Sequence, residues 1–154
     1  DRVVVNSGWG YCGEDEAAMW GRCRDHLGRL CLAAGREGIL LVMESLRQDE
    51  SNLVYSLERA RRMYEEIHHP NLKMMVDNIA TGAAGETLED WFQAFGDDLI
   101  HMHFLDGDPW LHNVWGDGNT ALARQIQTLN DHHFTDPYAA DRRNFRVLER
   151  FLQD

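Results

Sequence analysis

Three residues that could bind a metal or move a proton stand in equivalent places along this sequence. Glu44 and Asp77 each directly follow an apolar run, and His103 lies within a third apolar run. They are separated by about one strand–helix unit, so they would occupy matching positions on successive strands. Carboxylate oxygens and an imidazole nitrogen are donors that suit Mn²⁺, Mg²⁺, Co²⁺ or Zn²⁺. The pattern indicates a divalent metal site, although a charged residue that ends a strand can also cap a helix or face solvent.

Further polar and aromatic residues fall in loops beside these strand ends. Glu50 lies in the segment that follows Glu44 and could reach over the mouth of the site, or it could favour the start of a helix through the helix dipole. Aromatic and imidazole side chains could wall a sugar-sized pocket, with ordinary burial as the alternative for the tryptophans. The residues concerned are Trp9, Trp110, His112 and Trp115.

The elements that must position these side chains alternate between strand and helix. Unbroken apolar runs, typical of parallel strands covered on both faces, predict strands at residues 3–5, 39–43, 72–76 and 99–105. Helical periodicity and capping residues predict helices at residues 14–34, 51–67, 87–95, 121–129 and 136–152. Ser51 or Asn52 is the expected cap of the second helix, and Thr87 with Asp90 forms an expected capping box for the third.

Repeated strand–helix units with apolar strands predict an α/β fold built on a parallel sheet. A doubly wound open sheet and a (β/α)8 barrel both fit this pattern. The sequence contains neither a GxGxxG nor a Walker loop, which would favour a nucleotide-binding sheet. A complete barrel needs roughly 250 residues, so the 154 residues with four visible strands are expected to be part of a TIM barrel.

Composition narrows the classes of partner. Asp and Glu number 26 against 15 Lys and Arg, a net charge of −11, which argues against a nucleic-acid partner. No stretch approaches the roughly 18 apolar residues of a membrane helix, and no signal-peptide pattern is evident. The three cysteines form no CxxC motif and are expected to be free thiols in the cytoplasm.

Five segments together carry a family resemblance: residues 43–46, 75–80, 85–88, 101–107 and 115–118. They resemble the xylose isomerase-like TIM-barrel superfamily of sugar isomerases and epimerases, and within it are most similar to fructoselysine 3-epimerase and the ketose 3-epimerases. The resemblance implies that the chain supplies roughly the C-terminal half of the barrel, strands 4–7 and the final helix.

The resemblance also implies a divalent metal, Mn²⁺, Mg²⁺ or Co²⁺, held by a Glu, an Asp, a His and a second Glu from four successive strands. Glu44, Asp77 and His103 match the first three of these ligands. It further implies that Glu44 doubles as an acid or base. Glu50 matches a glutamate that contacts the substrate in ketose 3-epimerases.

The sequence departs from the ketose 3-epimerase pattern in three ways. Ala80 replaces a His and Pro109 replaces an Arg, both of which touch the free sugar in that branch, so a different substrate such as a fructosamine is favoured. The eighth strand with its ligand Glu would fall within residues 129–136, which are polar and lack a Glu. We therefore expect residues 1–154 to form one barrel domain, incomplete, with a segment missing near residues 134–135.

These observations predict a metal-dependent sugar epimerase or isomerase, catalytic if the fourth ligand is supplied. The enzyme would remove a proton next to a carbonyl, with Glu44 as one of the acid–base pair, and return it through an enediolate. The best fit is 3-epimerisation of a ketose or a fructosamine such as fructoselysine, in a homo-oligomer. The alternatives are an aldose–ketose isomerase of the same superfamily, a metal-dependent phosphodiesterase, which the negative charge disfavours, and a non-catalytic sugar-binding barrel.

Overall fold

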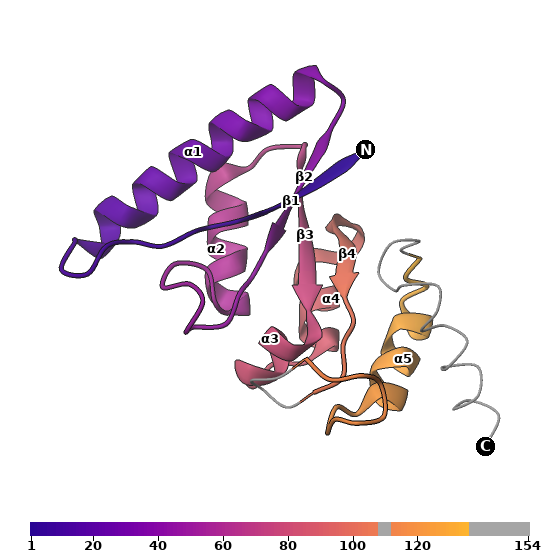
Figure 1. Cartoon of the computed structure of the whole chain (residues 1–154). Coiled ribbons are helices and arrows are strands. Elements are labelled where there is room, and N and C mark those ends of the chain that lie inside the picture. The colour runs from indigo at the N-terminus through magenta and orange to yellow at the C-terminus, as the bar shows by residue number, and fades with distance from the viewer. Residues whose placement is uncertain (108–111, 136–154) are drawn as a thin grey trace.

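The computed structural model describes residues 1–107 and 112–135. Four strands form one parallel sheet in the order in which they occur along the chain (Figure 1). A doubly wound sheet reverses its strand order at a switch point, whereas a barrel adds each strand beside the previous one. The sequential order therefore confirms the barrel architecture over the described part of the chain. The strands are β1 (Arg2–Asn6), β2 (Leu40–Glu44), β3 (Leu72–Asp77) and β4 (Leu99–His103).

The central strands are apolar because both of their faces are covered. Leu41, Val42 and Met43 of β2 are all buried, and every residue of β3 except Lys73 is buried as well. Alternate residues of each strand face the helices, where they join a core that includes Trp91 of the helix Leu88–Phe95. The absence of polar alternation in the sequence is thus explained by a sheet with two buried faces.

The first helix, α1 (Glu16–Arg36), begins at an aspartate cap and buries one side against the sheet. The Asp15 carboxylate accepts a hydrogen bond from the amide of Ala18, which satisfies one of the free N–H groups of the first turn. The helix starts two residues later and ends two residues later than the sequence predicts. Its buried face consists of Met19, Trp20, Cys23, Leu27 and Cys31.

The second helix, α2 (Leu57–Ile67), begins later than predicted. Its cap is Ser56, whose side chain accepts a hydrogen bond from the amide of Arg59, so the expected cap at Ser51 or Asn52 is wrong. The side chains of Ser51 and Asn52 bond instead to the loop that follows β1. The predicted capping box is confirmed at α4 (Leu88–Phe95), where Thr87 and Asp90 satisfy each other's backbone amides.

A short helix that the sequence did not reveal, α3 (Asn78–Ala83), follows β3 directly. The Asn78 side chain receives a hydrogen bond from the Leu105 amide at 2.8 Å and donates one to the Leu105 carbonyl at 2.7 Å. Because β3 passes into α3 at Asn78, the pairing of β3 with β4 stops at Asp77 and His103, and the Asn78 side chain binds the backbone of Leu105 instead. β4 therefore ends at His103 rather than at the predicted residue 105.

The chain continues through a short turn and a last described helix. A 3-10 turn, η1 (Gly96–Asp98), joins α4 to β4, and α5 (Leu122–Asp131) lies beside α4 (Figure 1). The eighth-strand position near residues 130–135 holds the end of α5 and a turn, and the helix predicted at residues 136–152 lies outside the described residues. Among the described helices, none is both long and apolar enough to cross a membrane.

Candidate metal centre

The three residues expected at matching strand ends converge in space. Glu44, Asp77 and His103 close β2, β3 and β4, and Asp77 and His103 are register partners. One ligand atom from each residue lies within 4.8 Å of the other two. The His103 Nδ1 atom is 2.9 Å from Glu44 Oε1 and 3.7 Å from Asp77 Oδ2. The arrangement leaves two carboxylate oxygens and one imidazole nitrogen facing a common point.

Asp77 is oriented by the helix that it caps. Its Oδ1 atom accepts hydrogen bonds from the amides of Ile79 at 2.8 Å and Ala80 at 3.0 Å, which leaves Oδ2 directed at His103. Burial acts to raise the pKa of the Asp77 carboxyl, but the neighbouring imidazole of His103 and the hydrogen bonds from the two amides outweigh burial and hold this pKa below its usual range. Asp77 is therefore a charged carboxylate whose free oxygen is already oriented toward His103.

The charge balance of this cluster favours a bound cation. The nearby carboxylates of Asp77 and Glu44 stabilise the imidazolium against burial and raise the pKa of His103 to about 10. At neutral pH the positive charge of protonated His103 thus compensates one of the two carboxylate charges. A divalent cation that displaces this proton would compensate both, and the donor set of two carboxylates and one imidazole fits Mn²⁺, Co²⁺ or Zn²⁺.

Glu50, the expected substrate contact, is held in place by Arg47. Its Oε1 atom accepts a hydrogen bond from the Arg47 guanidinium at 2.8 Å, and Oε2 accepts one from the Arg47 amide at 3.2 Å. The Glu50 side chain retains 40% of its exposure, whereas that of Arg47 retains 15%. The carboxylate is therefore fixed in direction but still open to a ligand.

Trp9 lies on a loop that is hydrogen-bonded to the loop carrying Glu50. The Ser51 hydroxyl donates to the carbonyl of Gly8 at 2.8 Å, and the Asn52 carboxamide accepts from the amide of Gly10 at 2.8 Å. A side chain at Gly10 would collide with Met19, so the backbone of Gly10 is held between Met19 and Asn52. Trp9 nevertheless remains 58% exposed, so its side chain presents an apolar surface from a fixed backbone.

The loop after β4 is organised around a buried carboxylate. Asp106 is 1% exposed, and its oxygens accept hydrogen bonds from four backbone amides. Burial acts to raise the pKa of Asp106, but these four N–H donors outweigh burial and hold the pKa below its usual range. The donors belong to Gly107, Gly116, Gly118 and Thr120.

The remaining predicted substrate contacts fall on this loop. His112 is exposed, whereas Trp115 is 8% exposed and donates from Nε1 to the carbonyl of Phe104 at 3.3 Å. Burial leaves Trp115 little surface to offer a ligand, so in this structure it acts mainly in packing. Trp110 and Pro109 lie outside the described residues.

Asn6 is a polar residue at a strand end that was not predicted from the sequence as part of the site. Asn6 ends β1 and is the register partner of Glu44, so four neighbouring strands each place a polar residue at the same edge. Asn6 follows its short apolar run just as Glu44 follows the next run, and this repetition was the available signal. It was missed because a carboxamide is not a typical ligand for the metals considered.

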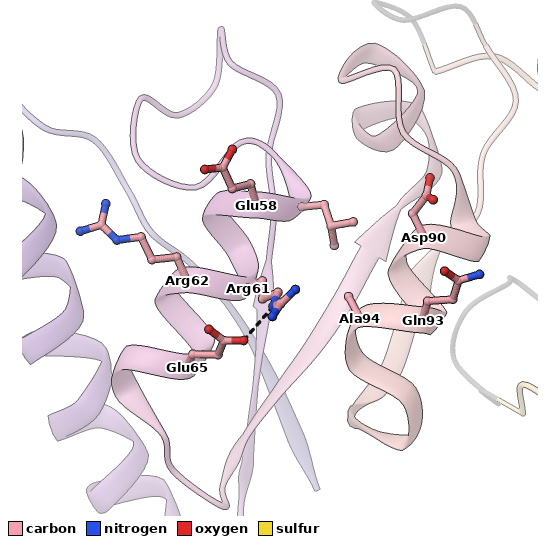
Figure 2. A pocket seen from close by; sticks show the side chains of 8 residues that line it. Glu58, Arg61, Arg62, Glu65, Asp90, Gln93 and Ala94 are labelled. Carbon is pink, nitrogen blue, oxygen red and sulfur yellow. Dashed lines mark hydrogen bonds and ion pairs between the residues drawn. The ribbon is translucent and has the colours of Figure 1, made fainter.

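Two hollows beside the helices of the described part of the chain are lined by other residues. One of them, a groove of about 640 Å³, lies between α2 and α4. Figure 2 shows the side chains that line it, among them Glu58, Arg61 and Asp90. Arg61 and Glu65 pair across one helical turn at 2.7 Å. The groove is therefore a solvated gap between two helices and separate from the metal centre.

Comparisons with known proteins agree with this architecture. A family model described as xylose isomerase-like TIM barrel matches residues 1–147. Fructoselysine 3-epimerase of Escherichia coli O157:H7 is 30% identical over 115 residues, which cover 73% of this chain and 42% of that protein. The chain thus spans less than half the length of this curated relative.

Two solved structures share the fold. A D-tagatose 3-epimerase-like protein superposes with a TM-score of 0.81 at 18% identity, covering 99% of this chain and 62% of that protein. The IOLI protein, solved with a bound zinc atom, superposes with a TM-score of 0.72 at 22% identity, covering 88% of this chain and 51% of that protein.

Proposed function

This chain belongs to the family of xylose isomerase-like TIM barrels, and on that premise we propose that it carries the metal site of a sugar epimerase. The observation that carries the proposal is the convergence of Glu44, Asp77 and His103 at one edge of a barrel-type sheet. In parallel α/β folds this edge is where active sites form. The similarity to a fructoselysine 3-epimerase supports the reaction type.

Glu44, Asp77 and His103 would hold a divalent cation, with Mn²⁺ as our first choice. Asp77 is preoriented by two amides, and His103 faces both carboxylates, so little rearrangement is needed for all three to share one ion. When bound, such a cation supplies Lewis-acid polarisation of a substrate carbonyl, which acidifies the neighbouring C–H group.

Glu44 is the group that we propose to move the proton. Its carboxylate would take the proton from the carbon beside the carbonyl and leave an enediolate. Inversion requires a second acid on the opposite face of that carbon, which the family resemblance places on the eighth barrel strand. Removal of the proton from C3 and its return to the opposite face of C3 gives epimerisation, whereas removal from C1 and return to C2 gives an aldose.

The substrate that we propose is a fructosamine such as fructoselysine. The exposed Trp9 side chain offers an apolar face for a sugar, and the carboxylate of Glu50, on the loop hydrogen-bonded to that of Trp9, is still partly open. By the family resemblance, Ala80 and Pro109 replace residues that bind free ketoses, which favours a different substrate. The three free cysteines suit the cytoplasm, and we propose that the protein works there as a homo-oligomer.

Deuterium exchange tests the proposal directly. The Mn²⁺-loaded full-length protein is incubated in D2O with fructoselysine and, separately, with D-fructose, and NMR follows the label at each carbon. We expect deuterium at C3 with appearance of the 3-epimer, loss of exchange in Glu44→Gln, and normal exchange in Glu58→Gln on the solvent face of α2. An aldose product would show an isomerase instead. Sugar binding without exchange would show a non-catalytic barrel.

A further inference from the structure

We propose that Asn6 binds the substrate by donating a hydrogen bond from its side-chain NH2 group to an oxygen of the sugar held at the metal centre. The inference rests on the proposed sugar-binding function and adds a residue that recognises the substrate. Three independent observations carry it: the register of β1, the orientation of the carboxamide and the chemistry of the neighbouring groups.

The register places Asn6 beside the metal centre. β1 and β2 are parallel, and Asn6 is the partner of Glu44. Neighbouring strands lie about 4.8 Å apart, and partners in register direct their side chains to the same face of the sheet. The carboxamide of Asn6 therefore stands next to the carboxylate of Glu44, within reach of a ligand whose oxygens extend over two or three atoms.

The orientation of the carboxamide is determined by its partner. The amide of Gly8 donates to Asn6 Oδ1 at 3.0 Å, and since an N–H group can only donate, the bonded atom must be the carbonyl oxygen. Within residues 1–107 and 112–135, nothing accepts a hydrogen bond from the NH2 group of Asn6. Asn6 is exposed, so this donor is open to a ligand.

A second loop holds this arrangement in place. The hydroxyl of Ser51, a fully buried residue, donates to the carbonyl of Gly8 at 2.8 Å. Gly8 itself has a φ of +66°, a conformation that favours glycine. Asn6 is thus a donor oriented before the substrate arrives, which reduces the entropy lost on binding.

The chemistry of Asn6 complements that of its neighbours. Glu44 and Asp77 are acceptors committed to a cation, and a carboxamide neither competes strongly for the cation nor adds charge. A ketose or fructosamine presents several hydroxyl and carbonyl oxygens that need neutral donors. The NH2 group meets that need at the strand end next to the ligand carboxylate.

Asn6→Asp separates substrate binding from turn formation. The aspartate keeps the oxygen that accepts from Gly8 and replaces the NH2 donor by an acceptor, whereas Asn6→Ala removes both. Asn130→Ala, at an exposed position near the end of α5, is the matched control. Each protein is titrated with Mn²⁺ by calorimetry. At saturating Mn²⁺ it is then titrated with fructoselysine, D-fructose and hydroxyacetone, a small chelating α-hydroxyketone.

We expect both Asn6 variants to bind the sugars and hydroxyacetone about three- to tenfold more weakly, with Asn130→Ala unchanged and Mn²⁺ affinity retained in Asn6→Ala. Wild-type affinity in Asn6→Asp would overturn the inference, because the turn alone would then explain Asn6. If the wild type binds hydroxyacetone but exchanges no sugar proton, the epimerase proposal fails and the hydroxyacetone titration still decides the role of Asn6. Binding of neither ligand would overturn both proposals.

Discussion

Replacing Asp106 by asparagine should destabilise the loop after β4 although the side chain keeps almost the same shape. In the structure, Oδ1 accepts from the amides of Gly107 at 2.8 Å and Thr120 at 3.1 Å, and Oδ2 accepts from those of Gly116 at 2.8 Å and Gly118 at 3.0 Å. An asparagine offers an oxygen to one pair only. Its NH2 group would face the two N–H donors of the other pair.

The magnitude follows from those two unsatisfied donors. A buried N–H group without an acceptor costs about 1–3 kcal/mol, and because most of these donors are only partly buried, two of them cost at most about 2–6 kcal/mol. The loop has little room to move away, because a Cβ atom at Gly118 would already lie 2.3 Å from Asp106 Oδ1. We therefore expect a loss of about 3 kcal/mol in the free energy of opening this loop.

Two measurements check the prediction. Urea unfolding monitored by circular dichroism gives the global free energy of unfolding, and hydrogen exchange at the amides of Gly116 and Gly118 gives the local opening. Asp117→Asn, an exposed position in the same loop, is the control and should change neither quantity by more than about 0.5 kcal/mol. If the exchange protection of both amides in Asp106→Asn equals that of the wild type, the reasoning is refuted.

Three further perturbations test the metal centre, the acid stability and a helix cap. His103→Gln should weaken Mn²⁺ binding at least about 100-fold in a calorimetric titration, and His26→Gln, at an exposed position of α1, should not. Since Asp106 has a folded-state pKa below its unfolded value of about 3.9, its contribution to stability is present above that pH and is lost as the pH falls through the folded pKa. Unfolding curves from pH 6 to pH 2 should therefore show a loss that is smaller in Asp106→Asn, and parallel curves for the two proteins would contradict this assignment. Thr87→Ala should lower the free energy of unfolding by about 1 kcal/mol because it removes the capping box, whereas an equal loss in the exposed control Thr135→Ala would argue against the cap.

The sequence by itself determined the strands and the three proposed metal ligands. Parallel strands covered on both faces must be apolar throughout, so each apolar run marks a strand and its last residue marks the functional edge. Glu44, Asp77 and His103 could be found in this way because their positions depend on local pattern and on regular strand–helix spacing. The capping box of Thr87 and Asp90 was predictable for the same reason, since its partners are three residues apart.

Only the tertiary structure decided the roles of residues whose partners are distant in the sequence. Ser51 and Asn52 have the side chains of helix caps, but they bond to a loop more than 40 residues earlier, and the helix starts later as a result. The side chain of Asn78 accepts a hydrogen bond from the amide of Leu105, which lies 27 residues further along the chain and just beyond β4. Asn6 becomes a neighbour of Glu44 only through the register of β1 and β2. Side-chain hydrogen bonds of this kind depend on which segments folding brings together, and short-range sequence patterns hold no information about that choice.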